Sequence, residues 1–224
     1  MSSANVYVVV KGYTEQTFVR EVLAPEMAVR NVFLHPVLIG KPGHKGGNIT
    51  FERAKRDVAG FLKQRSDTHV STMFDYFRLD PRWPGNVGVR RSSTAIEKAQ
   101  KIEAATLANI LELFPGHDVG GRFIPYIEMH EFEALLFSDA SILANELRVG
   151  RGEIKEVLDE FREPEEINDG QDTAPSKRLI RLYKGYRKVA MGKAISEAIG
   201  ISTMREKCPH FDDWVTKLER LGGE

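Results

Sequence analysis

The chain has 224 residues, of which 42% are hydrophobic and 29% charged, and its 32 lysines and arginines balance its 32 aspartates and glutamates. This composition excludes a disordered chain, and a net charge of zero excludes a uniformly basic sleeve for nucleic acid while leaving room for a local basic patch. The single cysteine, Cys208, excludes an intramolecular disulfide and a cysteine-rich zinc site, and it fits a reducing compartment.

The N-terminal segment predicts a cytoplasmic protein. Residues 1–5 contain no basic side chain, and the apolar stretch behind them is short and strand-like, so we expect no signal peptide. No apolar run approaches the ~20 residues that span a bilayer. We therefore expect a cytoplasmic location and no membrane contact.

Four short runs rich in β-branched and aromatic residues predict strands, at residues 6–10, 32–39, 69–74 and 123–127. Continuous apolar runs of this kind are typical of parallel sheets that are buried on both faces. Pro36, inside the second run, predicts an edge strand or a bulge because proline cannot donate a ladder hydrogen bond.

Helical periodicity fills the segments between these runs, at residues 14–29, 51–64 and 94–114. Pro25 is expected to end or kink the first of these helices. Beyond Ser138 the chain is polar, and short helices are expected at residues 153–162, 176–183, 192–198, 202–206 and 212–221.

The alternation of strands and helices predicts an α/β fold, with a Rossmann-like, mainly parallel sheet flanked by helices. We expect one domain, in which residues 1–140 form the α/β core and residues 141–224 form a helical C-terminal extension packed on it. In open sheets of this type, ligands bind at the C-terminal ends of the strands. Functional residues are therefore expected there.

Carboxylates follow three of the predicted strands. Glu15 comes one short turn after the first strand, Asp75 ends the third, and Glu131 and Glu133 follow the fourth. A sheet of this type should bring these strand ends together. Mg²⁺ prefers oxygen ligands, and two such ions can clamp an in-line phosphoryl displacement. The spacing is therefore compatible with a one- or two-metal site.

Each of these residues also has a purely structural interpretation. Glu15 lies in a first helical turn, where the macrodipole favours an acid, and Glu131 or Glu133 could be a helix-start acid. Asp75 closes a buried apolar run, which is a poor place for an idle carboxylate and favours a function. His130, beside them, could be a metal ligand, an acid–base group or a structural histidine, of which the last is the commonest.

Two basic segments could contact a nucleic-acid backbone. Their basic residues are Lys41, Lys45, Arg78, Arg82, Arg90 and Arg91. The first segment is glycine-rich without being a Walker A loop, and the second also contains Trp83. Such residues could follow phosphates, although a solvated charged loop is the simpler interpretation of the second segment. Lys177 opens a late helix and could stabilise developing phosphate charge, or it could simply be exposed.

Five segments together resemble a family of domains of unknown function, DUF4276. They are residues 8–15, 72–76, 123–137, 175–178 and 208–211, in order over nearly the whole chain, and the most specific block is His-Glu-Phe-Glu-Ala-Leu-Leu-Phe in the third. The family looks like a relative of the TOPRIM fold of topoisomerases, primases and overcoming-lysogenization-defect (OLD) nucleases. Its members look like partners of ATPases in bacterial anti-phage or mobile-element settings.

The resemblance implies roles for the strand-end residues. Glu15 matches the second glutamate of a TOPRIM E-G-x-T-E motif, and Asp75 matches the first acid of the metal pair. Glu131 and Glu133 would be further ligands of Mg²⁺ or Mn²⁺. Lys177 looks similar to the late lysine of the OLD-type site.

The chain departs from the TOPRIM pattern at two positions. Lys11 stands where the first glutamate of the motif is expected, and Phe77 stands where a second acid would follow Asp75. A charged lysine cannot bind Mg²⁺. The site is therefore expected to be weakened, rearranged or inactive, or to use an ammonium group in place of one metal.

Three functions follow from these observations. The first is a metal-dependent nuclease or phosphodiesterase subunit with Glu15, Asp75, His130 and Lys177 as catalytic residues. The second is an inactive TOPRIM-like module that binds nucleic acid or an ATPase partner, which Lys11 favours. The third is a phosphohydrolase that acts on a small nucleotide.

Overall fold

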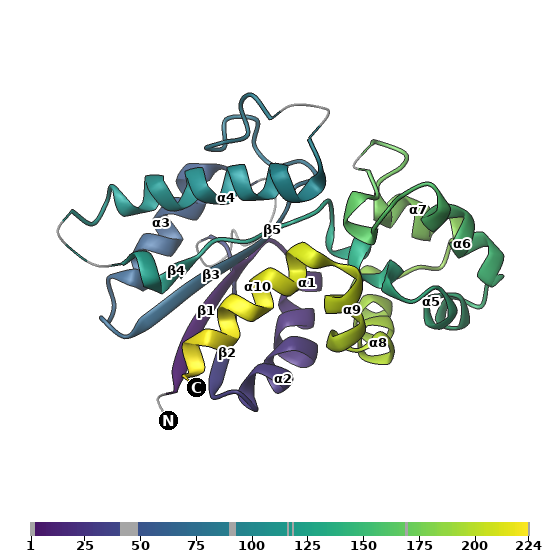
Figure 1. Ribbon diagram of the computed structural model, residues 1–224, viewed down its shortest axis with the longest axis horizontal. Helices are drawn as coiled ribbons and strands as arrows, with labels where there is room; N and C mark the ends of the chain where they lie inside the picture. The colour runs from purple at the N-terminus through teal and green to yellow at the C-terminus, as the bar shows by residue number, and fades with distance from the viewer. Residues whose placement is uncertain are drawn as a thin grey trace.

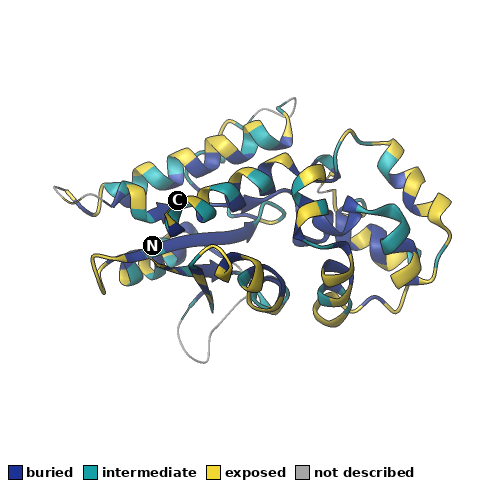
Figure 2. Cartoon of the chain, turned by 60° about the horizontal axis from the view of Figure 1, so that its bottom comes forward, coloured by how far each residue is buried: buried dark blue, intermediate teal, exposed yellow. Residues whose placement is uncertain are grey.

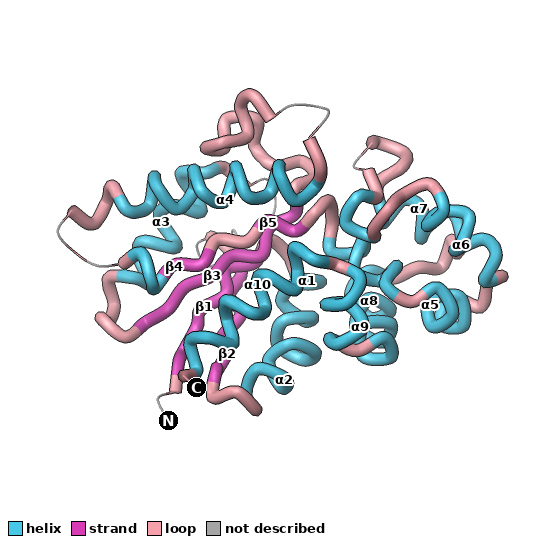
Figure 3. Tube along the Cα trace, viewed as in Figure 1, coloured by secondary structure: helices cyan, strands magenta, loops and turns pink. Residues whose placement is uncertain are grey.

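The computed structural model describes residues 3–40, 49–89, 93–115, 117, 119–168 and 170–223. Its sheet contains β2 (Val32–Leu38), β1 (Ala4–Val10), β3 (Thr68–Asp75) and β4 (Phe123–Ile124) in that order, and β5 (Ile127–Glu128) also pairs with β3. Every pairing is parallel (Figures 1 and 3). The prediction of an α/β fold with a mainly parallel sheet is therefore confirmed.

The position of β2 agrees with the prediction made from Pro36. β2 lies at the edge of the sheet, and Pro36 pairs in register with Val8 of β1. An edge strand tolerates proline because one of its sides has no strand to bond.

The fourth predicted strand is divided. β4 and β5 run along the same side of β3 and are separated at Pro125 and Tyr126. Pro125 has no N–H to donate. Across the gap, the Thr72 hydroxyl accepts a hydrogen bond from the Tyr126 N–H at 2.9 Å and donates one to the Tyr126 carbonyl at 3.1 Å. A side chain of β3 thus replaces part of the backbone ladder.

Helices cover both faces of the sheet. On one face lie α3 (Phe51–Leu62) and α4 (Ala95–Leu111), and on the other lie α1 (Tyr13–Phe18), α2 (Ala24–Ala28) and α10 (Pro209–Glu219) (Figure 1). β1 separates two apolar clusters, because Val8 packs with α1 and α10 whereas Val9 packs with α3 and α4. Figure 2 shows the strands as buried elements and the outer faces of the helices as exposed.

The first predicted helix changes its geometry near Pro25. A π-helical turn, Val19–Leu23, joins α1 to α2, and Pro25 lies in the first turn of α2. The proline lacks an N–H, and its ring crowds the carbonyl four residues earlier. A widened turn at this point removes that conflict while the chain stays helical.

The chain after β5 begins with a 3₁₀ segment, Phe132–Ser138. It continues through α5 (Ala140–Leu147), α6 (Arg151–Asp159), α7 (Pro175–Leu182), α8 (Lys188–Ile199) and α9 (Ile201–Lys207). Shorter 3₁₀ turns are Gly120–Arg122, Pro164–Glu166 and Arg220–Gly222. The helices from α5 to α9 gather beyond the C-terminal ends of the strands, and α10 returns along the sheet (Figure 1). No helix within the described ranges is long and apolar enough to cross a membrane.

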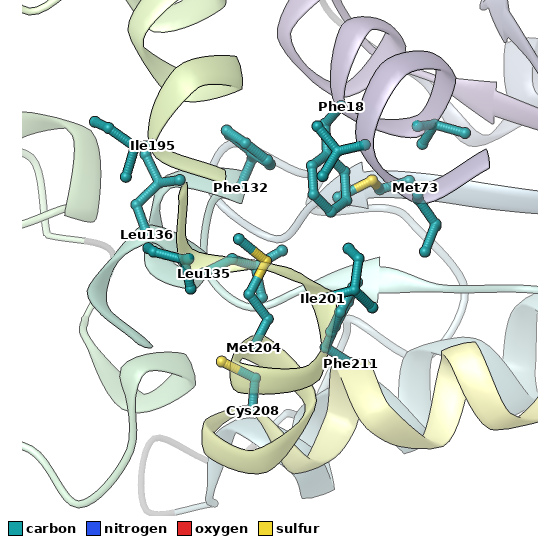
Figure 4. Packing of buried hydrophobic residues seen from close by; sticks show 14 of the residues in the cluster. Phe18, Met73, Phe132, Leu135, Leu136, Ile195, Ile201, Met204, Cys208 and Phe211 are labelled. Atoms are coloured by element: carbon teal, nitrogen blue, oxygen red, sulfur yellow. The ribbon is translucent and has the colours of Figure 1, made fainter. Parts of the chain in front are cut away.

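One apolar cluster joins the 3₁₀ segment to the core. Phe132 packs against Phe18 with 5.1 Å between ring centroids, and Leu135 belongs to the same cluster as Ile195 of α8 (Figure 4). Cys208 is buried there, with its sulfur 3.4 Å from the Ser138 hydroxyl, and burial raises the pKa of its thiol. The cysteine is therefore part of the core.

A buried tryptophan attaches α10 to the sheet. The Trp214 ring stacks on Tyr126 with centroids 4.3 Å apart, and its Nε1–H donates to the Ser71 hydroxyl at 2.9 Å. Replacing Trp214 with phenylalanine keeps an aromatic ring and removes the donor, so we expect a loss of about 1–2 kcal/mol in the free energy of unfolding. Urea denaturation measures this loss. In a double-mutant cycle with Ser71→Ala, additive losses would contradict the bond.

Candidate functional site

Four carboxylates meet at the C-terminal ends of β1, β3 and β5. Glu15 lies in α1 directly after β1, and Asp75 is the last residue of β3 and pairs with Glu128 of β5. Asp75 accepts a hydrogen bond from the backbone N–H of Phe132 at 3.1 Å. This bond holds the end of β3 against the short segment that carries Glu131 and Glu133. We call Glu15, Asp75, Glu131 and Glu133 the strand-end cluster.

Two lysines contact the cluster. The Lys11 ammonium lies 3.7 Å from Asp75 Oδ2 and donates to the Phe77 carbonyl at 3.5 Å. The Lys188 ammonium lies 3.0 Å from Glu133 Oε1 and 3.8 Å from Glu131 Oε1. The Lys188 side chain is 46% exposed, whereas those of Glu131 and Glu133 are 6% and 3% exposed. Lys188 therefore marks the side of the cluster that faces solvent.

Burial perturbs the acids of the cluster. Burial first, and the charge of Asp75 second, raise the pKa of Glu15 to about 8. Burial raises the pKa of Glu133 to about 7 against the opposing charge of Lys188, and it raises the pKa of Asp75 against that of Lys11. Burial would lower the pKa of Lys188, but the charges of Glu133 and Glu131 outweigh it and raise that pKa. The cluster thus holds four carboxyl groups beside two lysines, and the raised pKa values of Glu15 and Glu133 keep part of these acids protonated near neutral pH.

The segment at residues 175–178 contributes a backbone group to the site. Glu131 Oε2 accepts a hydrogen bond from the Ser176 N–H, at the start of α7, at 2.9 Å. Lys177 is exposed, and within the described part of the chain its side chain makes no ion pair. Lys188 occupies the place beside the carboxylates for which the sequence suggested Lys177. Lys188 could not be predicted from the sequence, because no local pattern shows that α8 begins beside the strand ends.

His130 lies next to the cluster in the chain. It is buried, its ring packs edge-on against Tyr76 with centroids 5.4 Å apart, and its carbonyl accepts a hydrogen bond from the Phe77 N–H at 2.8 Å. The peptide bond between Met129 and His130 is cis. The hydrogen bond between the Phe77 N–H and the His130 carbonyl extends the pairing between the end of β3 and the segment after β5.

The predicted nucleic-acid contacts divide into two groups. Arg78 and Arg82 are exposed, with Arg78 over the Phe77 ring at 5.0 Å and Arg82 Nε 3.4 Å from Asp80 Oδ1. The others lie outside the described residues, and they are Lys41, Lys45, Arg90 and Arg91.

Glu128 belongs to a second, fully buried set of polar groups. Its Oε2 accepts a hydrogen bond from the Tyr126 hydroxyl at 2.9 Å, and burial, then the charge of Glu165, raise its pKa well above the ordinary value. Glu165 accepts from the N–H groups of His210 and Phe211 at 3.0 and 2.9 Å. The last two bonds join the Pro164–Glu166 turn to the start of α10, and the Tyr126 ring stacks on His210 of α10 with centroids 4.9 Å apart. We therefore assign Glu128 a structural place beneath the strand-end cluster.

The cluster fits a hard divalent cation in the chemistry of its donors. All four side chains offer carboxylate oxygens, which Mg²⁺ and Mn²⁺ accept. Among the described residues, no group of three or more His, Cys, Asp and Glu side chains lies in a metal-binding arrangement. Lys11 and Lys188 instead lie against the carboxylates. Binding a cation would therefore require Asp75 and Glu133 to exchange a lysine contact for the metal.

The fold and the cluster define a parallel α/β protein with an acidic site at the C-terminal strand ends. The chain belongs to the DUF4276 family, described as a domain of unknown function, which it matches over residues 10–219. A search of the curated proteins and a search of the solved structures each gave no match.

Proposed function

We propose that this chain is a TOPRIM-like, Mg²⁺- or Mn²⁺-dependent nuclease or phosphodiesterase subunit that works through the strand-end cluster. The observation that carries the proposal is the convergence of four largely buried carboxylates from three strand ends. Clusters of this composition hold hard cations in phosphoryl-transfer sites. The partner ATPase and the anti-phage or mobile-element setting are proposed from the sequence resemblance alone.

The residues of the cluster would have different roles in phosphodiester hydrolysis. Asp75, Glu15 and one or both of Glu131 and Glu133 would hold the cation. The chemistry supplied by Mg²⁺ or Mn²⁺ in such a site is polarisation of the phosphate and activation of water. The water oxygen forms a bond to phosphorus, one ester P–O bond breaks, a carboxylate takes the proton of the water, and the leaving oxygen gains a proton. Lys188 offers positive charge where a phosphate would approach from solvent.

A second candidate is a non-catalytic module that uses the same edge of the sheet to bind nucleic acid or an ATPase. The ion pair between Lys11 and Asp75 favours it, because a lysine already neutralises the acid best placed to hold a metal. Under this alternative, binding needs no metal and the bound chain stays uncut.

Plasmid cleavage with Mn²⁺ separates the two candidates. We expect the wild type to cut in Mn²⁺ and to stop in EDTA, and we expect Lys11→Glu to cut about 10-fold faster because it adds a carboxylate ligand. Lys155→Glu makes the same charge change on the exposed surface of α6 and should leave the rate unchanged.

If neither the wild type nor Lys11→Glu cleaves the plasmid, autonomous catalysis is refuted and the non-catalytic binding module is favoured. Cleavage by Lys11→Glu alone would identify a nuclease site that the lysine blocks. Hydrolysis of a small phosphodiester without plasmid cleavage would indicate the nucleotide phosphohydrolase.

A further inference from the structure

The connection between α7 and α8 forms a basic and aromatic segment beside the strand-end cluster. Residues 183–188 read Tyr-Lys-Gly-Tyr-Arg-Lys. Two of its side chains anchor it, because Tyr186 is buried and Lys188 forms ion pairs with Glu133 and Glu131. The C-terminal end of the segment is thus anchored at the solvent-facing side of the cluster.

Tyr183 presents an aromatic surface to solvent. The residue is 40% exposed, and its ring lies against Gly185, where an added Cβ would come within 2.7 Å of a ring carbon. Only glycine leaves room for this position of the ring. The ring is therefore supported by the chain on one side while a large part of it stays accessible.

Two exposed cations accompany this ring. Lys184 and Arg187 are exposed, and in the part of the chain that the structure describes neither side chain forms an ion pair. The ionised carboxylates of the cluster repel an approaching phosphate, and cations near the cluster offset that repulsion. Lys184 and Arg187 add positive charge in the same segment as Lys188.

We propose that residues 183–188 bind single-stranded nucleic acid, with a base stacked on Tyr183 and flanking phosphates on Lys184 and Arg187. This inference rests on the proposed function and gives it a substrate class. In a duplex the faces of the bases are covered by their neighbours, so an exposed tyrosine ring has no base to stack on. In a single strand every base offers a face, and stacking platforms with basic neighbours bind such strands without reading sequence.

Fluorescence anisotropy of the full chain in EDTA tests the proposal without catalysis. The probes are a labelled oligothymidylate about 16 nucleotides long and a duplex of equal length. We expect tighter binding of the single strand, a loss of about 10-fold or more in Tyr183→Ala, and near wild-type binding in Tyr183→Phe. Gly185→Ala should weaken binding less than Tyr183→Ala does, because the new methyl group shifts the ring while the ring itself and every charge remain.

The charged residues need a matched control. Lys184→Glu with Arg187→Glu should weaken binding and reduce its dependence on salt, whereas Arg151→Glu with Lys155→Glu makes the same charge change on exposed α6 and should have little effect. Equal losses in both pairs would overturn the proposal, because binding would then follow net charge alone. Equal or tighter binding of the duplex, no measurable binding, or an unchanged Tyr183→Ala would also overturn it.

The outcomes separate this proposal from the proposed function. If the chain binds single strands through Tyr183 but never cleaves them, the binding role of residues 183–188 is supported and the proposed nuclease activity is refuted. If cleavage depends on Asp75 while Tyr183→Ala keeps the wild-type affinity and KM, the nuclease activity is supported and the binding role of residues 183–188 is refuted.

Discussion

Replacing Asp75 with alanine is expected to abolish cleavage in Mn²⁺ and to weaken Mn²⁺ binding by about 100-fold or more, since loss of even an outer-shell partner of a metal costs about 10–100-fold. Asp75 has the central position in the strand-end cluster. It ends β3, contacts Lys11 and accepts a hydrogen bond from Phe132. Its removal takes away the carboxylate that joins the β1 side of the site to the segment after β5.

Calorimetric titration with Mn²⁺ measures this effect without relying on activity. Asp75→Asn is the companion variant, because an amide oxygen still accepts from the Phe132 N–H while the charge is lost. Asp67→Ala is the control, since Asp67 is an exposed aspartate just before the opposite end of β3. Unchanged Mn²⁺ affinity in a folded Asp75→Ala would count decisively against the metal site.

The stability of the metal-free chain is expected to fall as pH rises from about 5 to about 8, by an amount on the order of a few kcal/mol. The pKa of Glu15 is raised from 4.5 to about 8 by burial and by Asp75 and Glu133, against the charge of Lys11. Between these values the folded state binds more protons than the unfolded state. The contribution of Glu15 to stability is therefore fully present below pH 4.5 and is lost as pH rises through about 8.

Urea denaturation at several pH values, with and without Mg²⁺, measures this dependence. Glu15→Gln should flatten the pH profile, because an amide has no charge to bury. Glu26→Gln, on the exposed surface of α2, should leave the profile as it is in the wild type. Mg²⁺ should restore the stability of the wild type near pH 8, because it favours the ionised carboxylates. Identical profiles for Glu15→Gln and the wild type would refute the link between Glu15 and stability.

Local patterns were sufficient for the strands and for most of the helices, although they did not predict α5. The β-branched runs identified the strands, and the helical stripe that begins after Thr94 identified α4, which Thr94 and Glu97 cap in the structure. Pro36 pointed to an edge strand, and β2 is one. These features depend on side-chain shape and backbone chemistry within a few residues, so the sequence shows them directly.

Contacts between distant segments could not be predicted from local sequence patterns. The strand predicted at residues 123–127 is divided at Pro125, which lacks an N–H, and at Tyr126, whose backbone bonds Thr72 of another strand. The lysine that joins Lys11 beside the carboxylates is Lys188 rather than Lys177, because α8 begins against the segment after β5 while Lys177 faces solvent. Neither arrangement follows from spacing along the chain.

The sequence by itself determined a parallel α/β protein of the DUF4276 family with acids at its strand ends. Only the tertiary structure decided which charges meet there: Lys11 with Asp75, and Lys188 with Glu131 and Glu133. The physical reason is the difference in the sequence distance over which these interactions act. Strand and helix preferences act over a few neighbouring residues, whereas burial and Coulomb interactions depend on which distant segments the fold brings within a few ångströms.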